Sequence, residues 1–112
     1  MLAALVVPSS ASAKSSYRYC GNKGITGPIV KGPINGAGFF NIRVRKVSCR
    51  AAARLIRSRT SGRWDCDFAK GAGTCYSPDY EWECRWRSTG YESAREVCLA
   101  HGGRRVRYLT AA

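Results

Sequence analysis

The chain has 112 residues, with 19 lysine and arginine residues against 7 acidic ones, which gives a formal net charge of +12. This length allows a single domain, and no apolar stretch approaches the ~20 residues that a membrane-spanning helix needs. The 6 cysteines include no C-x-x-C pair and are accompanied by 1 histidine, so they favour disulfide bonds over a zinc site. Composition therefore predicts a small basic disulfide-stabilised domain, with no metal and no cofactor.

Residues 1–13 have the features of the end of a secretory signal peptide. The apolar run Leu2–Val7 corresponds to the hydrophobic region of such a peptide, and Ala11, Ser12 and Ala13 form an A-x-A cleavage site. Export to an oxidising compartment allows cysteines to pair. We therefore expect a secreted, extracellular protein with three disulfide bonds among these residues: Cys20, Cys49, Cys66, Cys75, Cys84 and Cys98.

Residues 14–38 are expected to be an N-terminal segment followed by a glycine- and proline-rich loop. Lys14–Tyr19 is a polar lead-in, and Cys20 would anchor it through a disulfide bond. Gly24–Gly38 contains the triplet Gly-Pro-Ile twice. Because proline lacks the backbone N–H that a helix or a central strand uses, we interpret Gly24–Gly38 as a connector.

The pattern of residues 39–47 predicts a strand. Apolar and polar residues alternate along it, which places Ile42 and Val44 on one face of a sheet and Arg43 and Arg45 on the other. The strand would therefore have a core face and a cationic face.

A helix is predicted over Cys49–Arg59, with Ser48 as its N-cap. Its apolar residues recur at helical spacing and would pack on the sheet; they are Cys49, Ala52, Ala53 and Ile56. We expect Cys49 to form a disulfide bond with Cys20 or Cys84. Three arginines lie away from the apolar stripe and would join Arg43 and Arg45 in one positive patch; they are Arg50, Arg54 and Arg57.

Residues 63–78 are expected to be loop-rich, because glycines and a proline punctuate them. Cys66 and Cys75 are nine residues apart around the glycines and could pair locally.

Three further segments complete the predicted fold. Tyr80–Arg87 alternates, with aromatic residues and Cys84 on one face and charged residues on the other, and Arg104–Thr110 is a second strand. Glu92–Leu99 fits either a helix or a strand, and local propensity favours the helix. With this segment as a strand, residues 39–112 form a β-α-β-β-β domain of the α+β class, in which one helix packs on a small antiparallel sheet.

Three pieces of the sequence follow one another in a recognisable order: Val47–Arg54, Trp82–Cys84, and Gly90–Arg95, which leads through Cys98 to Gly103–Tyr108. This order resembles small exported cysteine-containing proteins of actinobacteria and related high-GC bacteria, which are hypothetical secreted proteins. In similar sequences the segment matching Glu92–Leu99 is extended, so the resemblance implies a strand there. It implies no catalytic residues.

The charge distribution favours a non-enzymatic module that binds anionic surfaces or polymers. Residues 14–63 contain twelve basic residues and no acid. The candidate anion-binding residues are Arg43, Arg45, Arg50, Arg54 and Arg57. Arginine suits bidentate contacts to phosphate and carboxylate. Candidate partners are therefore an anionic cell-wall polymer, anionic lipid or nucleic acid, bound without sequence specificity.

Two alternative functions remain open from the sequence. The protein could be an inhibitor of an extracellular enzyme, or a small toxin, that presents Gly24–Gly38 to a secreted protein partner. It could also be a small secreted nuclease that uses Glu92, Glu96 and His101 with neighbouring arginines, which requires these side chains to lie within hydrogen-bond reach of one another.

Overall fold

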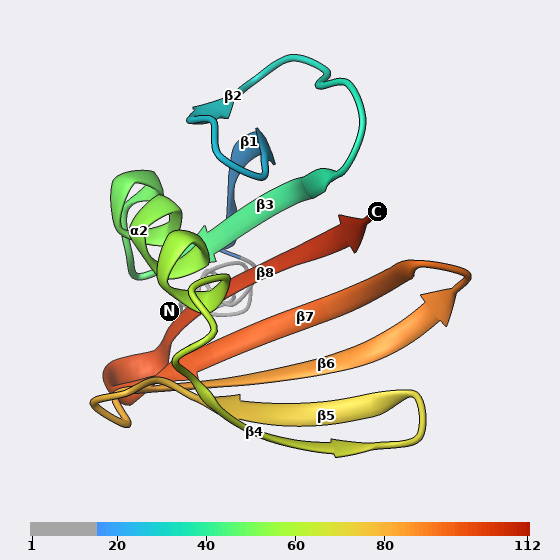
Figure 1. Ribbon diagram of the computed structural model, residues 1–112. Coiled ribbons are helices and arrows are strands. Elements are labelled where there is room, and N and C mark those ends of the chain that lie inside the picture. Colours follow the sequence, from blue (N-terminus) through green and yellow to red (C-terminus); the bar gives the residue numbers. More distant parts are fainter. Residues whose placement is uncertain (1–15) are drawn as a thin grey trace, which may run out of the picture.

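The computed structural model describes residues 16–112 (Figure 1). The expected signal peptide, residues 1–13, lies outside the described residues. The elements in chain order are β1 (Arg18–Gly24), β2 (Ile29–Val30), β3 (Gly38–Arg45), α2 (Cys49–Arg59), β4 (Asp65–Ala69), β5 (Ala72–Tyr76), β6 (Trp82–Gly90), β7 (Ser93–Ala100), a 3-10 turn (His101–Gly103) and β8 (Arg104–Ala111).

All eight strands form one sheet in the order β2-β1-β3-β8-β7-β6-β5-β4, and every pairing is antiparallel. The helix lies beside β3 and β8, and the β4–β5 hairpin forms the opposite end of the sheet (Figure 1). We call the sheet face that α2 covers the inner face and the opposite one the outer face. The inner face carries the core: its buried residues include Ile42, Val44 and Val106, together with Ile56 of the helix.

The prediction of one helix on an antiparallel sheet is confirmed, but the sheet has twice the expected number of strands. Four strands occur where they were expected, namely β3, β6, β7 and β8. The polar lead-in and the connector contain β1 and β2, and residues 63–78 contain the β4–β5 hairpin. The protein is therefore mostly β, and the α+β class fits it only loosely.

Glycines explain why the sequence predicts loops where the additional strands lie. Gly21 lies inside β1 at φ +130°, next to a shift in the β1–β3 register, and Gly71 makes the β4–β5 turn at φ +72°. These backbone conformations favour glycine, so glycine here marks a bulge and a hairpin turn inside the sheet rather than the end of regular structure.

The helix begins and ends where the sequence predicts. Ser48 Oγ accepts a hydrogen bond from the Ala51 backbone N–H at 3.0 Å, which satisfies one of the free donors of the first turn. Ala52, Leu55 and Ile56 are buried against the sheet. This stripe fixes the helix over the inner face.

The segment Glu92–Leu99, which fits a helix or a strand by its sequence, lies in strand β7 except for Glu92, which directly precedes the strand. Pairing on both sides outweighs its helical propensity, because β7 lies between β6 and β8 and bonds to each over its full length. The inward residues Glu96 and Cys98 are both buried, as the alternation of a strand requires.

Three disulfide bonds join the six cysteines. Cys49, at the start of α2, bonds to Cys20 on β1, which is one of the two partners left open by the sequence. The other bonds are Cys66–Cys75 and Cys84–Cys98, and both join residues directly opposite one another on neighbouring strands. Three intramolecular disulfides are typical of extracellular proteins.

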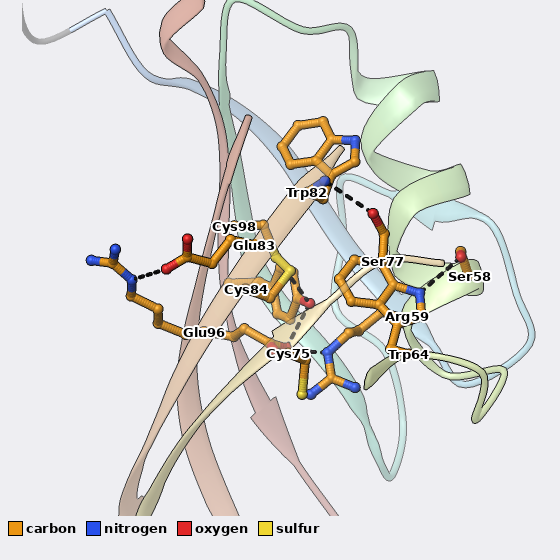
Figure 2. The surroundings of a disulfide bond; sticks show 12 residues. Ser58, Arg59, Trp64, Cys75, Ser77, Trp82, Glu83, Cys84, Glu96 and Cys98 are labelled. Carbon is orange, nitrogen blue, oxygen red and sulfur yellow. Dashed lines mark hydrogen bonds and ion pairs between the residues drawn. A yellow bond between two sulfur atoms is a disulfide. The ribbon is translucent and has the colours of Figure 1, made fainter. Parts of the chain in front are cut away.

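A buried polar cluster lies on the inner face next to the Cys84–Cys98 bond (Figure 2). Tyr108 donates its hydroxyl hydrogen to Glu96 Oε1 at 2.7 Å, and Arg59 Nε donates to Glu96 Oε2 at 2.9 Å. Glu96 is only 4% exposed, so its carboxylate has lost its hydrogen bonds to water, and these two donors replace them.

We predict that Gly21→Ala destabilises the protein by roughly 2–4 kcal/mol, since it combines backbone strain with a steric clash. A Cβ atom at Gly21 would lie 2.1 Å from the Val30 carbonyl oxygen, at a φ that disfavours alanine. Gly24→Ala, on the same strand, is the matched control, because no atom lies within 4 Å of its added Cβ. Urea unfolding measures both; equal midpoints for the two variants would contradict the prediction.

We also predict that Tyr108 makes the protein less stable in alkali. Burial and the adjacent Glu96 carboxylate raise the pKa of Tyr108 well above its usual value near 10. Above pH ~10 the unfolded chain therefore loses this proton while the folded chain keeps it, and the free energy of unfolding falls by up to about 1.4 kcal/mol per pH unit. Tyr108→Phe should flatten this slope in chemical denaturation between pH 9 and 12, whereas Tyr91→Phe, at a residue 90% exposed, serves as the control.

Candidate anion-binding face

The five arginines expected to form one patch lie on two sides of the molecule. Arg50, Arg54 and Arg57 are exposed on the solvent side of α2, as expected. Arg43 and Arg45 alternate with the buried residues of β3 and therefore lie on the outer face. The sheet separates the two groups because α2 packs on the inner face, so the single patch predicted from the sequence does not exist.

The outer face instead gathers arginines from four adjacent strands. Each of them alternates with inward residues of its own strand, and together they form what we call the arginine face: Arg43 and Arg45 of β3, Arg85 and Arg87 of β6, Arg95 of β7, and Arg105 and Arg107 of β8. The only acidic residue that these four strands place on the same face is Glu83. The charge of this surface is therefore strongly positive.

Several of these arginines are directly opposite one another. Arg43 is the cross-strand partner of Arg107, and Arg45 is the partner of Arg105. On the next pair of strands Arg87 is opposite Arg95. Like charges that face each other across strands destabilise a sheet, so this arrangement lowers the stability of the unbound protein.

The surroundings of the arginine face neutralise only part of its charge. Arg85 Nε donates to Glu83 Oε2 at 2.6 Å, at a solvent-exposed position where an ion pair contributes little. The Arg107 guanidinium lies 4.0 Å from the ring centre of Tyr17, and that of Arg43 lies 5.3 Å from the ring centre of Tyr19. Aromatic rings hold an arginine in place by cation–π attraction but leave its full charge.

Two adjoining hollows shape this face. The larger has a volume of about 640 Å³, and the arginines that line it are Arg85, Arg87, Arg95 and Arg105. The smaller, of about 170 Å³, is lined by Arg43, Arg95 and Arg107 among others. Arg95 lines both hollows, so it lies at the centre of the arginine face. Apolar side chains such as Val97 and Leu99 also line the larger hollow.

Five of these seven arginines were missed as site residues, although the sequence carries a signal for them. Arg85 and Arg87 alternate with Trp86, and Arg105 and Arg107 alternate with Val106, so each pair predictably shares one strand face. What the sequence does not contain is the order of the strands, which brings these pairs next to β3.

The helix arginines form a separate group. Arg57 lies near Lys23, whose pKa is lowered by burial and by the charge of Arg57. Lys23 Nζ donates to the Gly27 carbonyl oxygen at 2.7 Å, and this bond holds the Gly24–Gly38 connector against β1. No carboxylate among residues 16–112 forms an ion pair with Arg50, Arg54 or Arg57.

The three side chains of the nuclease hypothesis, Glu92, Glu96 and His101, lie far from one another. Glu92 precedes β7 and His101 follows it, so the eight residues of β7 lie between them, and the two residues are about 30 Å apart in an extended strand. Glu96 is buried on the inner face and holds Arg59 and Tyr108. These three residues therefore form no common catalytic site.

Comparison of the chain with protein-family models, with curated proteins and with solved structures found no match. Within residues 16–112, no helix has the length and apolar character to cross a membrane.

The opposed arginines lead to a stability prediction. If Arg43 and Arg107 repel each other, Arg43→Gln and Arg107→Gln each relieve the same repulsion, so the double variant should gain less than the sum of the two single changes. We expect a coupling energy of about 0.2–1 kcal/mol at low salt, which should shrink at high salt.

Urea unfolding of the double-mutant cycle measures this coupling. The matched cycle pairs Arg107→Gln with Arg50→Gln, which lies across the sheet on α2 and should be additive. Equal coupling in both cycles would show that the effect comes from total charge rather than from the register of β3 and β8.

Proposed function

We propose that this protein is an exported, non-enzymatic module that binds anionic polymers or surfaces through its arginine face. The observation that carries the proposal is the direct opposition of Arg43 to Arg107, of Arg45 to Arg105 and of Arg87 to Arg95. A sheet face arranged in this way is destabilising when free and is stabilised by an external anion.

The chemistry of the face favours phosphate-bearing partners. Guanidinium groups bind phosphate and carboxylate in bidentate geometry. Neighbouring strands are about 4.8 Å apart and alternate residues along one strand about 6.7 Å apart, so the arginines form a grid that can contact several charges of one polymer. Because Arg95 lines both hollows, a chain crossing it would contact both groups of arginines.

The partner class is an anionic cell-wall polymer, anionic lipid or nucleic acid, recognised by charge rather than by sequence. Such binding releases counterions and weakens steeply with salt. The proposal does not include recognition of particular bases or sugars by the arginine face.

Export is supported by two lines of reasoning. Three disulfide bonds stabilise the chain in an oxidising environment, and reduction would remove their contribution in the cytosol. The A-x-A site at residues 11–13 and the resemblance to small secreted proteins of high-GC bacteria point the same way.

Two variants that remove the same charge test the proposal. The sheet variant carries Arg43→Gln, Arg95→Gln and Arg107→Gln, and the helix variant carries Arg50→Gln, Arg54→Gln and Arg57→Gln. We expect the sheet variant to weaken binding to polyphosphate, single-stranded DNA and anionic vesicles at least tenfold more than the helix variant, because it removes contacts that are pre-arranged on one face. Fluorescence titration at several salt concentrations measures both affinity and salt slope.

Two results would contradict the proposal. Equal losses in both variants would mean that binding follows net charge alone, and an affinity of the unaltered protein that does not change with salt would exclude polyanion binding by the arginines. Circular dichroism of both variants controls for folding.

A further inference from the structure

Four of the six cysteines form a single row across the inner face, which we call the cysteine row: Cys66, Cys75, Cys84 and Cys98. Cys66 on β4 is directly opposite Cys75 on β5, and Cys75 is in turn directly opposite Cys84 on β6. Cys84 is directly opposite Cys98 on β7. The two disulfide bonds therefore lie end to end in one line across four strands.

This placement allows the row to pair in a second way. Residue pairs of an antiparallel sheet alternate between a close type and a hydrogen-bonded type about 5.5 Å apart at Cα. The bonded pairs are of the close type, with Cα atoms 4.0 Å apart for Cys66–Cys75 and 3.9 Å apart for Cys84–Cys98. Cys75 and Cys84 are consequently of the wider type, and that separation lies within the range that a disulfide bridges.

Access from solvent differs along the row. Cys66 is partly exposed on the edge strand β4, whereas Cys75, Cys84 and Cys98 are 0% exposed. An external thiol can therefore reach only the Cys66 end. Cys75, the next cysteine inward, is directly opposite Cys84, so breaking the Cys66–Cys75 bond frees a thiolate on the strand next to the Cys84–Cys98 bond.

We propose that the cysteine row is a disulfide relay, in which reduction by a small thiol at Cys66 is passed through Cys75 and Cys84 to Cys98. The thiolate of the small thiol attacks Cys66 Sγ; the Cys66–Cys75 bond breaks, and its electron pair stays on Cys75. Cys75 then attacks Cys84 Sγ, so that a Cys75–Cys84 bond forms while Cys84–Cys98 breaks and its electron pair leaves on Cys98.

A second small thiol completes the reaction. It attacks the mixed disulfide at Cys66 and leaves as the oxidised thiol dimer, and the protons of the two small thiols end on Cys66 and Cys98. The protein then holds one disulfide in the row, Cys75–Cys84, and two thiols. This exchange does not involve the arginine face, so it is independent of anion binding.

The surroundings of Cys98 favour the thiol form of this sulfur once it has left the disulfide. The Tyr108 hydroxyl oxygen lies 3.9 Å from Cys98 Sγ and, because its own hydrogen is donated to Glu96, it can accept a hydrogen bond from the Cys98 thiol. The sulfurs of Cys84 and Cys98 and a carboxylate oxygen of Glu96 all lie within 4.8 Å of one another, as Figure 2 illustrates for these side chains. The negative charge of Glu96 disfavours a lasting thiolate on Cys98 and therefore favours its protonation to the thiol.

Limited reduction of the full chain with a monothiol, followed by acid quenching and alkylation, tests the relay. Trypsin cleaves after Lys70 and Arg85, and a glutamate-specific protease cleaves after Glu81, so each of the four cysteines falls on its own peptide. We expect the first reduced species to carry label on Cys66 and Cys98, with a Cys75–Cys84 cross-linked peptide and loss of both native ones. Label on Cys66 and Cys75 with Cys84–Cys98 intact would overturn the proposal, as would simultaneous reduction of all four.

A matched pair of variants removes the need for a reductant. Cys66→Ser leaves Cys75 free beside Cys84, and we expect Cys98 to be labelled and the Cys75–Cys84 peptide to form. Cys75→Ser leaves Cys66 free, but Cys66 is not opposite Cys84, so label should stay on Cys66 alone. Label confined to Cys75 in the first variant, or Cys98 labelled equally in both, would overturn the relay.

Discussion

The register of β6, β7 and β8 is the constraint on which the rest of the structure depends. A shift by one residue would turn every side chain of a strand to the other face. The disulfide Cys84–Cys98 holds β6 to β7 in register, and the buried bond from Tyr108 to Glu96 holds β7 to β8. The same register puts Arg87 opposite Arg95, so the crowding of charge on the outer face follows from the bonds that order the inner face.

The two faces of the sheet differ in how far their charged side chains are paired. Among residues 16–112 the one buried carboxylate is that of Glu96, on the inner face. Both of its oxygens accept hydrogen bonds from Arg59 and Tyr108, which offsets the cost of removing the charge from water. On the outer face the arginines meet other arginines and aromatic rings, with Glu83 paired to Arg85 and Asp67 of β4 at the border of the larger hollow. The buried carboxylate is thus paired within the protein, whereas most guanidinium groups of the arginine face have no carboxylate partner among the described residues.

The parts of the fold that were predictable are those encoded locally. The alternation in β3 and β6 and the cap at Ser48 depend on neighbouring residues, so strand, helix and helix start could be derived from sequence. The order of the strands depends on pairing between distant segments, such as Arg43 with Arg107, and no local pattern contains it. For this reason the sequence assigns individual arginines to a strand face but does not predict the arginine face as a whole. The prediction that the helix arginines share one patch with Arg43 and Arg45 is wrong for the same reason.

The ends of the sheet limit how copies of this protein meet. An open antiparallel sheet exposes unpaired N–H and C=O groups at each edge, which is a template for fibril growth. One edge strand, β2, is only two residues long, and the other, β4, carries Asp65 and Asp67. Two β4 edges that approached each other would bring these carboxylates together, so charge repulsion disfavours growth of the sheet at this edge even though the sheet is not closed.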